Sequence, residues 1–408
     1  MDAFNKQELK KDIKLAVGTS AISTPSKMEL HSIISDTLDD MIEDRRISID
    51  DDQKKILIEE IEDDISGLGP IQKFLEDEHI TEIMINGPYQ IYIESKGIKT
   101  LSDKTFDDED HLRSSIEKML KESGRRLDER SPFVDFSLSD GSRVNAIIPP
   151  LSVDGTTVTI RKFLETIASL NDLVDFKTID KRIKDFLKSS IKARLNILFS
   201  GATGSGKTST LSVLANEIGD SERIITIEDA LELKIDKDHV IRLLTKDKNI
   251  EDKGEITIRD LFKNTLRMRP SRLILGEIRG EEALDLLQAI NSGHEGTLAV
   301  LHASTPYDAI GRLETMAMYS KLNIPASEIR RQIVSGIDII IQHEQLTDGS
   351  RKITEIAEVE SLQNGEVTLN TVFKFETDSL EADGKVTGHF NFLEKPKTDK
   401  FKKYGITF

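Results

Sequence analysis

Residues 201–208 read GATGSGKT, and they follow the apolar run 195–200, LNILFS. The octapeptide fits the pattern G-x-x-x-x-G-K-[ST] at every fixed position. An apolar strand precedes it, and residues 209–214 (STLSVL) can continue as a helix, which is the context that a phosphate-binding loop requires. A glycine-rich turn without a ligand is the alternative, and this context disfavours it. The stretch therefore predicts an α/β domain built around a nucleotide site.

Each part of this loop has a chemical task. The glycines let the backbone bend, so that several N–H groups can point at a polyphosphate. Lys207 is expected to reach the β- and γ-phosphates, and the Thr208 hydroxyl is expected to coordinate Mg²⁺. The predicted cofactors are therefore ATP and Mg²⁺. The candidate nucleotide-binding residues are Gly201, Ala202, Thr203, Gly204, Ser205, Gly206, Lys207, Thr208 and Ser209.

Strands and helices alternate on both sides of the loop. Further short apolar strands are expected at 224–227, 273–275 and 298–301, with helical segments between them. Such alternation predicts a mostly parallel sheet that helices cover on both faces. Thr178 is expected to cap a helix whose apolar face carries Ile179, Ile183, Phe186, Leu187 and Ile191.

The chain before residue 166 has a different texture. Residues 1–66 are acidic and have apolar residues at helical spacing. Residues 67–165 predict a smaller α+β, PAS-like domain, with hairpins at 80–93 and 133–148, a helix at 109–122 and a last strand at 158–160 that runs into Arg161, Lys162 and Phe163. The nucleotide domain is expected over 166–345, and a β segment with a basic tail over 346–408.

Composition excludes several classes of protein. The 408 residues include no cysteine, so disulfides and thiolate metal sites are excluded, and the net charge of −17 argues against a large nucleic-acid footprint. Acidic residues concentrate at 36–64 and basic ones at 385–403; each run is expected to be solvated surface, with partner docking as the alternative. The first thirty residues contain no signal-like apolar stretch, and the apolar run 337–341 is far too short to span a membrane. A cytoplasmic protein that reaches a membrane only through partners is expected.

Hydrolysis needs groups beyond the loop. Glu277 follows the strand 273–276, and Glu228 with Asp229 follows the strand 224–227; ligands of such sheets lie at the carboxyl ends of strands. Glu277 is expected to orient and activate water and to be one of the Mg²⁺ ligands, with an ordinary exposed glutamate as the alternative. Glu228 and Asp229 are expected to hold Mg²⁺ through water or to shape the site, rather than merely to cap a helix. For His302 a role in sensing the γ-phosphate competes with simple packing.

Positive charge on the transition state is the remaining requirement. Arginines occur near the Glu277 strand and in the preceding domain, and we expect at least one of them to serve the nucleotide while the others form ion pairs. They are Arg267, Arg269, Arg272 and Arg279, and Arg143 and Arg161.

Several short motifs together resemble one known family. The segments 267–270 (RMRP), 276–280 (GEIRG), 288–294 (QAINSGH) and 301–303 (LHA) are similar to the type II/IV secretion ATPases. The segments 140–150 (DGSRVNAIIPP) and 160–163 (IRKF) look most like the CpaF/TadA branch, the motors of tight-adherence (type IVc) pili. The likeness covers roughly residues 60 to 375.

The resemblance implies a RecA-like domain in a homohexameric ring, with each nucleotide between that domain and the N-terminal one. It implies that inner-membrane platform proteins of a pilus or secretion system are the partners, and that nucleic acid is not. By position, Glu277 becomes the catalytic Walker B glutamate, and Glu228 with Asp229 the Asp box. His294 and His302 fall in the His box, and Arg143 and Arg161 become arginines that face the γ-phosphate.

Three positions depart from the common patterns. Gly276 stands where a general Walker B motif has Asp, which places more of the Mg²⁺ ligation on Thr208; Ser271 and Ser304 replace an expected acidic residue and an expected Asn. Rival functions are a retraction, protein-export or conjugative DNA-transfer motor with the same fold, a nucleotide-gated scaffold without turnover, and a P-loop kinase. No lid or acceptor pocket for a kinase is evident in the sequence.

Overall fold

The computed structural model describes residues 6–20, 26–45, 47, 49–95, 97–121, 123, 125–162, 169–246, 253–320, 322, 324–380 and 384–407. Two compact units form, Met1–Leu164 and Glu165–Phe408. Phe163 and Glu122, which the sequence placed at the ends of a strand and a helix, lie outside the described residues, as does the expected domain boundary at 165/166.

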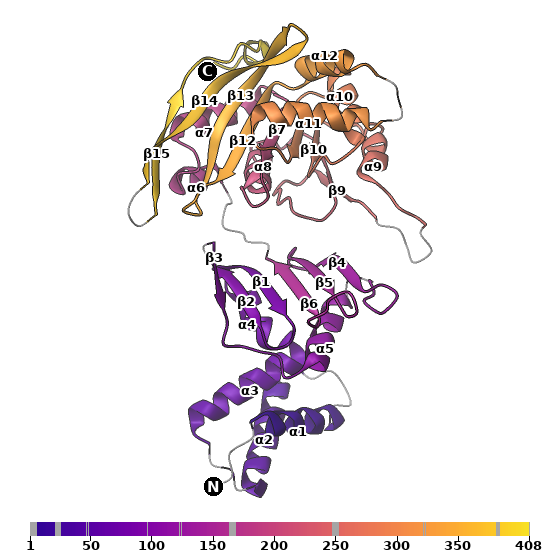
Figure 1. Ribbon diagram of the computed structural model, residues 1–408, viewed down its shortest axis with the longest axis vertical. Helices are drawn as coiled ribbons and strands as arrows, with labels where there is room; N and C mark the ends of the chain where they lie inside the picture. Colours follow the sequence, from indigo (N-terminus) through magenta and orange to yellow (C-terminus); the bar gives the residue numbers. More distant parts are fainter. Residues whose placement is uncertain are drawn as a thin grey trace. The chain divides into compact units, whose positions relative to one another are not determined.

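The first unit begins with a helical bundle (Figure 1). Its helices are α1 (Lys6–Ser20), α2 (Lys27–Arg45) and α3 (Asp51–Ser66). Asp50 caps α3 in a reciprocal capping box with Gln53, which satisfies donors at the helix start. Each helix buries an apolar face in a common core, to which Ile13, Ile34 and Ile61 contribute fully buried side chains. The expected N-terminal helical segment is therefore present.

A six-stranded antiparallel sheet follows in the same unit, in the order β3-β2-β1-β6-β5-β4. Its elements are η1 (Gly69–Ile71), α4 (Gln72–Glu76), β1 (Ile80–Asn86), β2 (Ile91–Ser95), β3 (Ile98–Leu101), α5 (Glu109–Leu120), β4 (Phe133–Ser137), β5 (Arg143–Ile147) and β6 (Thr157–Arg161). Both expected hairpins form, β1 with β2 and β4 with β5. Helix α5 buries its apolar side against the sheet.

A cluster of charged side chains joins the bundle to α5. Lys14 Nζ on α1 donates to Asp64 of α3 at 2.8 Å and to Asp107 at 3.0 Å. His111 of α5 lies 3.2 Å from a carboxylate oxygen of each aspartate. The two carboxylates are thus shared among cations from α1 and α5, which holds these helices together.

The second unit contains a nine-stranded sheet in the order β15-β14-β13-β12-β7-β11-β10-β8-β9. Six neighbouring strands of this sheet, β12, β7, β11, β10, β8 and β9, run parallel to one another. The other three, β13, β14 and β15, extend the sheet beyond β12, and each is antiparallel to the strand before it. The strands are β7 (Ile197–Gly201), β8 (Ile224–Glu228), β9 (Val240–Leu244), β10 (Arg272–Leu275), β11 (Leu298–Leu301), β12 (Ile339–Gln345), β13 (Arg351–Gln363), β14 (Glu366–Leu380) and β15 (Val386–Phe392).

Helices cover both faces of the parallel part of this sheet (Figure 1). Alternate strand residues such as Phe199 face the cluster made with α6–α8, whereas their neighbours such as Leu198 face the cluster made with α9–α12. The helices are α6 (Leu170–Asp175), α7 (Lys181–Lys192), α8 (Lys207–Ala215), α9 (Ile258–Thr265), α10 (Glu282–Asn291), α11 (Pro306–Met318) and α12 (Ala326–Gly336). The predicted α/β class is confirmed.

The structure corrects one local prediction and adds elements. Thr178 is not the cap of the helix that follows it: Asp180 accepts the N–H of Ile183 and caps α7 one turn before the buried Phe186. Asp180 is the cap because it lies three residues before Ile183, whose N–H group has no partner within the helix and can reach the Asp180 carboxylate. Strands β3, β9 and β15 were not predicted. The boundary expected at 345/346 falls between β12 and β13, which pair within the same sheet.

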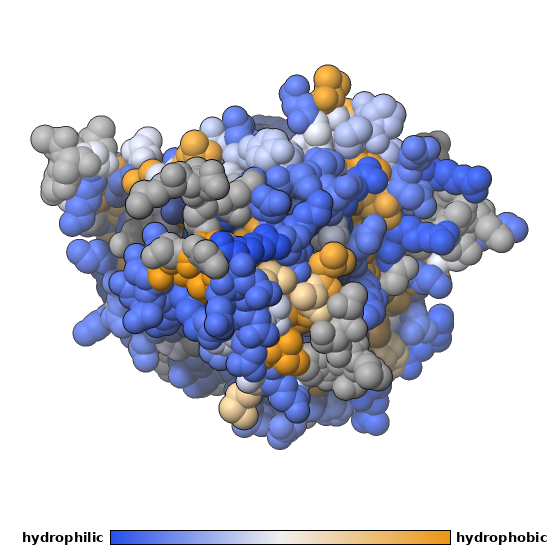
Figure 2. All heavy atoms as spheres, turned by 90° about the horizontal axis from the view of Figure 1, so that it is seen from below, coloured by the Kyte–Doolittle hydropathy of each residue, from blue (hydrophilic) through white to orange (hydrophobic). Residues whose placement is uncertain are grey.

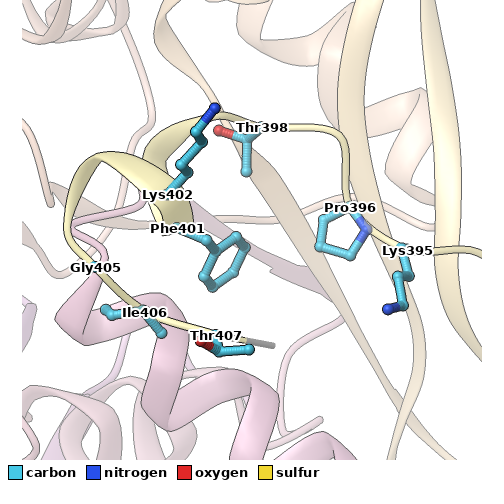
Figure 3. A pocket seen from close by; sticks show the side chains of 8 residues that line it. All are labelled: Lys395, Pro396, Thr398, Phe401, Lys402, Gly405, Ile406 and Thr407. Atoms are coloured by element: carbon cyan, nitrogen blue, oxygen red, sulfur yellow. The ribbon is translucent and has the colours of Figure 1, made fainter.

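The C-terminal tail folds back on the second unit. Phe401, in the short helix α13 (Lys400–Lys403), is 7% exposed and lies 6.0 Å from the Phe186 ring. The tail borders a cavity of about 430 Å³, lined by Lys395, Pro396, Thr398, Phe401, Lys402, Gly405, Ile406 and Thr407 (Figure 3). This cavity contains none of the predicted nucleotide-binding residues.

The face of the molecule drawn in Figure 2 is mainly hydrophilic, and its hydrophobic side chains are scattered. Within the described ranges, none of the helices has both the length and the apolar character that crossing a membrane requires.

Candidate functional site

The phosphate loop follows the central strand of the nine-stranded sheet. Strand β7, between β12 and β11, ends at Gly201, and α8 begins at Lys207. Gly201, Gly204 and Gly206 all have positive φ, at 149°, 76° and 96°. A Cβ at Gly201 would come within 2.4 Å of the His343 carbonyl oxygen on β12, so only glycine fits between these strands.

Lys207 points into the loop. It is 5% exposed, and its Nζ donates to the carbonyl oxygens of Gly201 at 2.9 Å and Ala202 at 2.7 Å. The ammonium therefore lies on the inner side of the loop, where a polyphosphate would meet it.

His302 connects this lysine to Glu277. It follows β11, and its Nδ1 lies 3.4 Å from Lys207 Nζ while its Nε2 lies 3.2 Å from Glu277 Oε1. An ammonium can only donate, so we assign Nδ1 as the acceptor and place the proton on Nε2, which faces the carboxylate. Burial, and after it the charge of Lys207, lowers the pKa of His302 below its ordinary value. A neutral imidazole with this tautomer fits the arrangement.

Glu277 is held between two strands. The N–H of Gly276 donates to Ile227 on β8, and the N–H of Ile278 donates to Val300 on β11, so the residue between them projects from the carboxyl edge of the sheet. Its Oε2 accepts from Arg279 Nη2 at 2.5 Å. Arg279 Nη1 also lies 3.5 Å from Asp229 Oδ2, and the carboxylates raise the pKa of the guanidinium.

Glu228 is a buried, structurally bound carboxyl group. It is 1% exposed; Oε2 accepts the N–H groups of Glu232 and Leu233 at 2.8 Å each, and Oε1 accepts from Thr226 Oγ1 at 3.1 Å. Burial outweighs these bonds and raises the pKa of Glu228. A Cβ at Gly276 would lie 3.1 Å from Glu228 Cγ, a close contact that would require a small shift of the Glu228 side chain.

Glu232 is the site residue that the sequence reasoning missed. Thr208 Oγ1 donates to its Oε2 at 3.4 Å, and the bonds to Glu228 fix its backbone. A hydroxyl and a carboxylate from two elements supply the hard oxygen ligands that Mg²⁺ prefers, so these residues fit the metal. The available signal was weak: a third acidic residue four positions after the strand-end Glu228.

Other predicted residues lie elsewhere. His294 precedes β11 and lies at the opposite edge of the sheet from His302; its Nδ1 is 3.1 Å from the Ala289 carbonyl oxygen. Arg272 is 2% exposed and is bound to Glu222, which is a structural role. Arg267 donates to Asn264, and Arg269 has a positive φ of 54° before Pro270. None of these four side chains has a described contact with the Lys207–Glu277 group.

Arg143 and Arg161 face each other in the first unit. They are direct partners in the antiparallel register of β5 and β6, and Glu82 on β1 is opposite Arg161 on its other side. Arg161 is exposed and Arg143 half-buried. Residues 18 positions apart in the sequence thus form one positively charged pair on neighbouring strands.

Comparisons with known proteins identify the family of this chain. Residues 64–372 match the family described as Type II/IV secretion system protein. The chain belongs to that family. A putative conjugal transfer protein of Mycobacterium tuberculosis is 30% identical over 303 residues, which cover 73% of this chain and 86% of that protein. The type IV secretion system protein VirB11 of Bartonella henselae is 32% identical over 329 residues, which cover 72% of this chain and 92% of that protein.

A solved structure supports the fold. The pilus retraction motor PilT with bound ADP superposes with a TM-score of 0.51 at 20% identity, covering 74% of this chain and 80% of its own. At that identity the likeness concerns the RecA-like fold alone. Residues 1–63, which include most of the helical bundle, precede the stretch that matches the family.

Proposed function

We propose that the protein is a Mg-ATP-hydrolysing motor of a secretion or pilus system. The observation that carries the proposal is the unbroken series of side-chain contacts from Lys207 through His302 to Glu277. It brings a phosphate-binding cation, a proton-bearing imidazole and a carboxylate to one edge of the sheet. Phosphoryl transfer to water needs positive charge at the phosphates and a carboxylate that orients the nucleophile.

The chain's own residues would divide the work as follows. Lys207 and the loop amides bind the β- and γ-phosphates, and Glu277 orients the attacking water and accepts its proton. His302 and Arg279 hold the two oxygens of that carboxylate, so that its direction is set before the nucleotide arrives. Thr208 and Glu232 would hold the metal, which neutralises developing phosphate charge when bound; Glu228 shapes this site through the Glu232 backbone.

Assembly and closure extend the same proposal. We propose a homohexameric, cytoplasmic ring attached to inner-membrane platform proteins, in which Arg143 and Arg161 approach the γ-phosphate and leave it after hydrolysis. The paired position of these arginines in the β5–β6 register supports a joint role. Arg279, His294 and Asp229 are proposed to contribute to the nucleotide site within this assembly.

The type of machine has two candidates. The N-terminal motifs at 140–150 and 160–163 favour a tight-adherence (type IVc) pilus motor. The names of the conjugal-transfer and VirB11 relatives favour a type IV secretion or conjugative motor instead. The net charge of −17 disfavours direct DNA threading. An ATPase rate that does not change with added DNA supports the pilus motor, and strong stimulation by DNA supports the conjugative one.

Replacement of Glu277 by Gln tests the enzymatic proposal. The variant should bind ATP with nearly normal affinity but release phosphate about 10²–10⁴ times more slowly, because the base is lost while the shape remains. Lys207→Ala, which should lose binding itself, is the control. If the wild type binds Mg-ATP without releasing phosphate, the protein is a nucleotide-gated scaffold. If Glu277→Gln turns over normally, another group is the base.

A further inference from the structure

The hairpin between β12 and β13 lies against the phosphate loop. β12 pairs in parallel with β7, and His343 is opposite Gly201, the first residue of the loop. Two residues later β12 ends, and the chain turns back with Arg351 opposite Gln345. The first residue of β13 is thereby delivered to the carboxyl edge of the sheet, where the loop lies.

The turn itself is pinned on both sides. The Leu346 N–H donates to the Ser350 carbonyl oxygen at 2.8 Å, and Asp348 accepts the Ser350 N–H at 2.9 Å. The other oxygen of Asp348 accepts the N–H of Val386 at the start of β15, also at 2.9 Å. Arg351 thus extends from a short, braced turn, so its side chain starts from a defined position.

Arg351 contacts the loop at Gly204 and lies beside Gly206. Its Nε donates to the Gly204 carbonyl oxygen at 2.7 Å, and its Cδ lies 3.4 Å from where a Cβ of Gly206 would be. The contact spans 147 residues of sequence, and it is a hydrogen bond from a charged donor, the stronger kind.

We propose that Arg351 is a positioning residue for the nucleotide, which acts by holding the peptide plane between Gly204 and Ser205. The proposal rests on the proposed function, because it presumes that the loop binds a polyphosphate. Through Arg351, the β12–β13 hairpin would take a direct part in setting the geometry of the nucleotide site.

The geometry of a trans peptide supplies the reason. Its C=O and N–H groups point in opposite directions, so a donor that holds the Gly204 carbonyl from outside turns the Ser205 N–H inward. That N–H indeed meets the Ala202 carbonyl oxygen, at 3.3 Å. The same oxygen accepts from Lys207 Nζ, so the Ser205 N–H and the ammonium share the inner side of the loop.

The kinetic consequence follows because ATP and ADP share the β-phosphate that the loop would hold. A preformed loop binds the substrate, the transition state and ADP alike, so its loss should weaken binding without slowing the chemical step. An arginine that served the γ-phosphate in the transition state would behave in the opposite way, lowering kcat. The two roles are therefore separable by measurement.

Three substitutions separate hydrogen bonding from charge. Arg351→Gln places an amide N–H donor the same number of bonds from Cα as the arginine Nε, but without charge. Arg351→Met keeps an unbranched side chain of similar length as far as the Nε position but has no donor. Arg351→Lys keeps the charge and moves the donor one bond further out. Arg182→Met is a matched control, since Arg182 donates to a main-chain carbonyl oxygen of Phe390 instead of the loop.

The test is a titration of the full-length protein with a fluorescent ADP analogue and Mg²⁺, followed by ATPase kinetics. We expect Arg351→Met to bind the analogue about tenfold more weakly, which is about 1.4 kcal/mol, to raise KM similarly and to leave kcat within about twofold. Arg351→Gln should stay within about threefold of the wild type, Arg351→Lys should lie between, and the melting temperature should not change.

Several results would overturn the proposal. One is unchanged ADP binding in Arg351→Met. Another is full rescue by Lys with none by Gln, which would mean that the charge acts on the phosphates directly. A third is an equal loss in Arg182→Met, which would indicate a general effect on stability. If instead the wild type does not bind the analogue, or Lys207→Ala binds it equally well, the proposed function itself fails.

Discussion

Replacement of the buried Glu228 discriminates between a direct metal ligand and a structural carboxylate. Glu228→Gln and Glu228→Ala differ in whether the backbone N–H groups that Glu228 binds keep a hydrogen-bond acceptor. In the Gln variant the amide oxygen can accept the two backbone N–H groups of Glu232 and Leu233 while its NH₂ group faces Thr226, whose hydroxyl can rotate to accept. In the Ala variant both N–H groups lose their partner.

The magnitudes follow from the burial of this site. An unsatisfied buried donor costs about 1–3 kcal/mol, so Glu228→Ala should lose about 2–5 kcal/mol, whereas Glu228→Gln should stay within about 1 kcal/mol. Because burial raises the pKa of Glu228 above 4.5, its favourable contribution is complete below that pH and is lost as the pH rises through the folded-state pKa. The Gln variant should therefore gain stability relative to the wild type as the pH rises above 4.5.

Thermal unfolding and Mg²⁺-dependent ATP binding measure the two roles separately. We expect the Ala variant to unfold on the order of 10 °C lower, and the Gln variant to melt near the wild type and to retain Mg-ATP affinity within about threefold. Loss of metal-dependent binding in the Gln variant, at an unchanged melting temperature, would refute the structural role and make Glu228 a direct ligand. A fully stable Ala variant would refute the hydrogen-bond argument.

Three further predictions concern groups outside this carboxylate. Arg161→Ala should lower kcat or ATP affinity in the assembled protein, and unchanged steady-state ATPase kinetics would rule out the closure mechanism. The pKa of His302 lies below 6.5, so its neutral form persists above that value; kcat/KM should be flat there and fall at lower pH as a second cation forms beside Lys207, and His302→Gln should lack this acid limb. Burial lowers the His111 pKa, but hydrogen bonds with Asp107 and Asp64 outweigh it and raise the pKa above 6.5. The stabilisation by His111 should thus be complete below pH 6.5 and decline as the pH rises through the folded pKa; melting curves of His111→Asn should lack this alkaline decline, and a parallel pH profile would contradict it.

Local rules explain the parts that were predicted. The phosphate loop needs only contiguous residues, so its glycines, Lys207 and Thr208 could be assigned from the sequence pattern alone. The hairpins at 80–93 and 133–148 likewise depend on alternation and turn residues close in sequence. Glu277 could be placed because the carboxyl ends of parallel strands meet at one edge of the sheet.

By itself the sequence determined the α/β class, the position of the nucleotide loop and the edge of the sheet at which the chemistry must occur. Only the tertiary structure decided which side chains meet there, because strand order and register are set by packing of the whole sheet and not by neighbours in the chain. The contact of His302 with Lys207 joins residues 95 positions apart, and that of Arg351 with Gly204 joins residues 147 apart. Periodicity carries no information about such pairs, and the same holds for the register that puts Arg143 opposite Arg161.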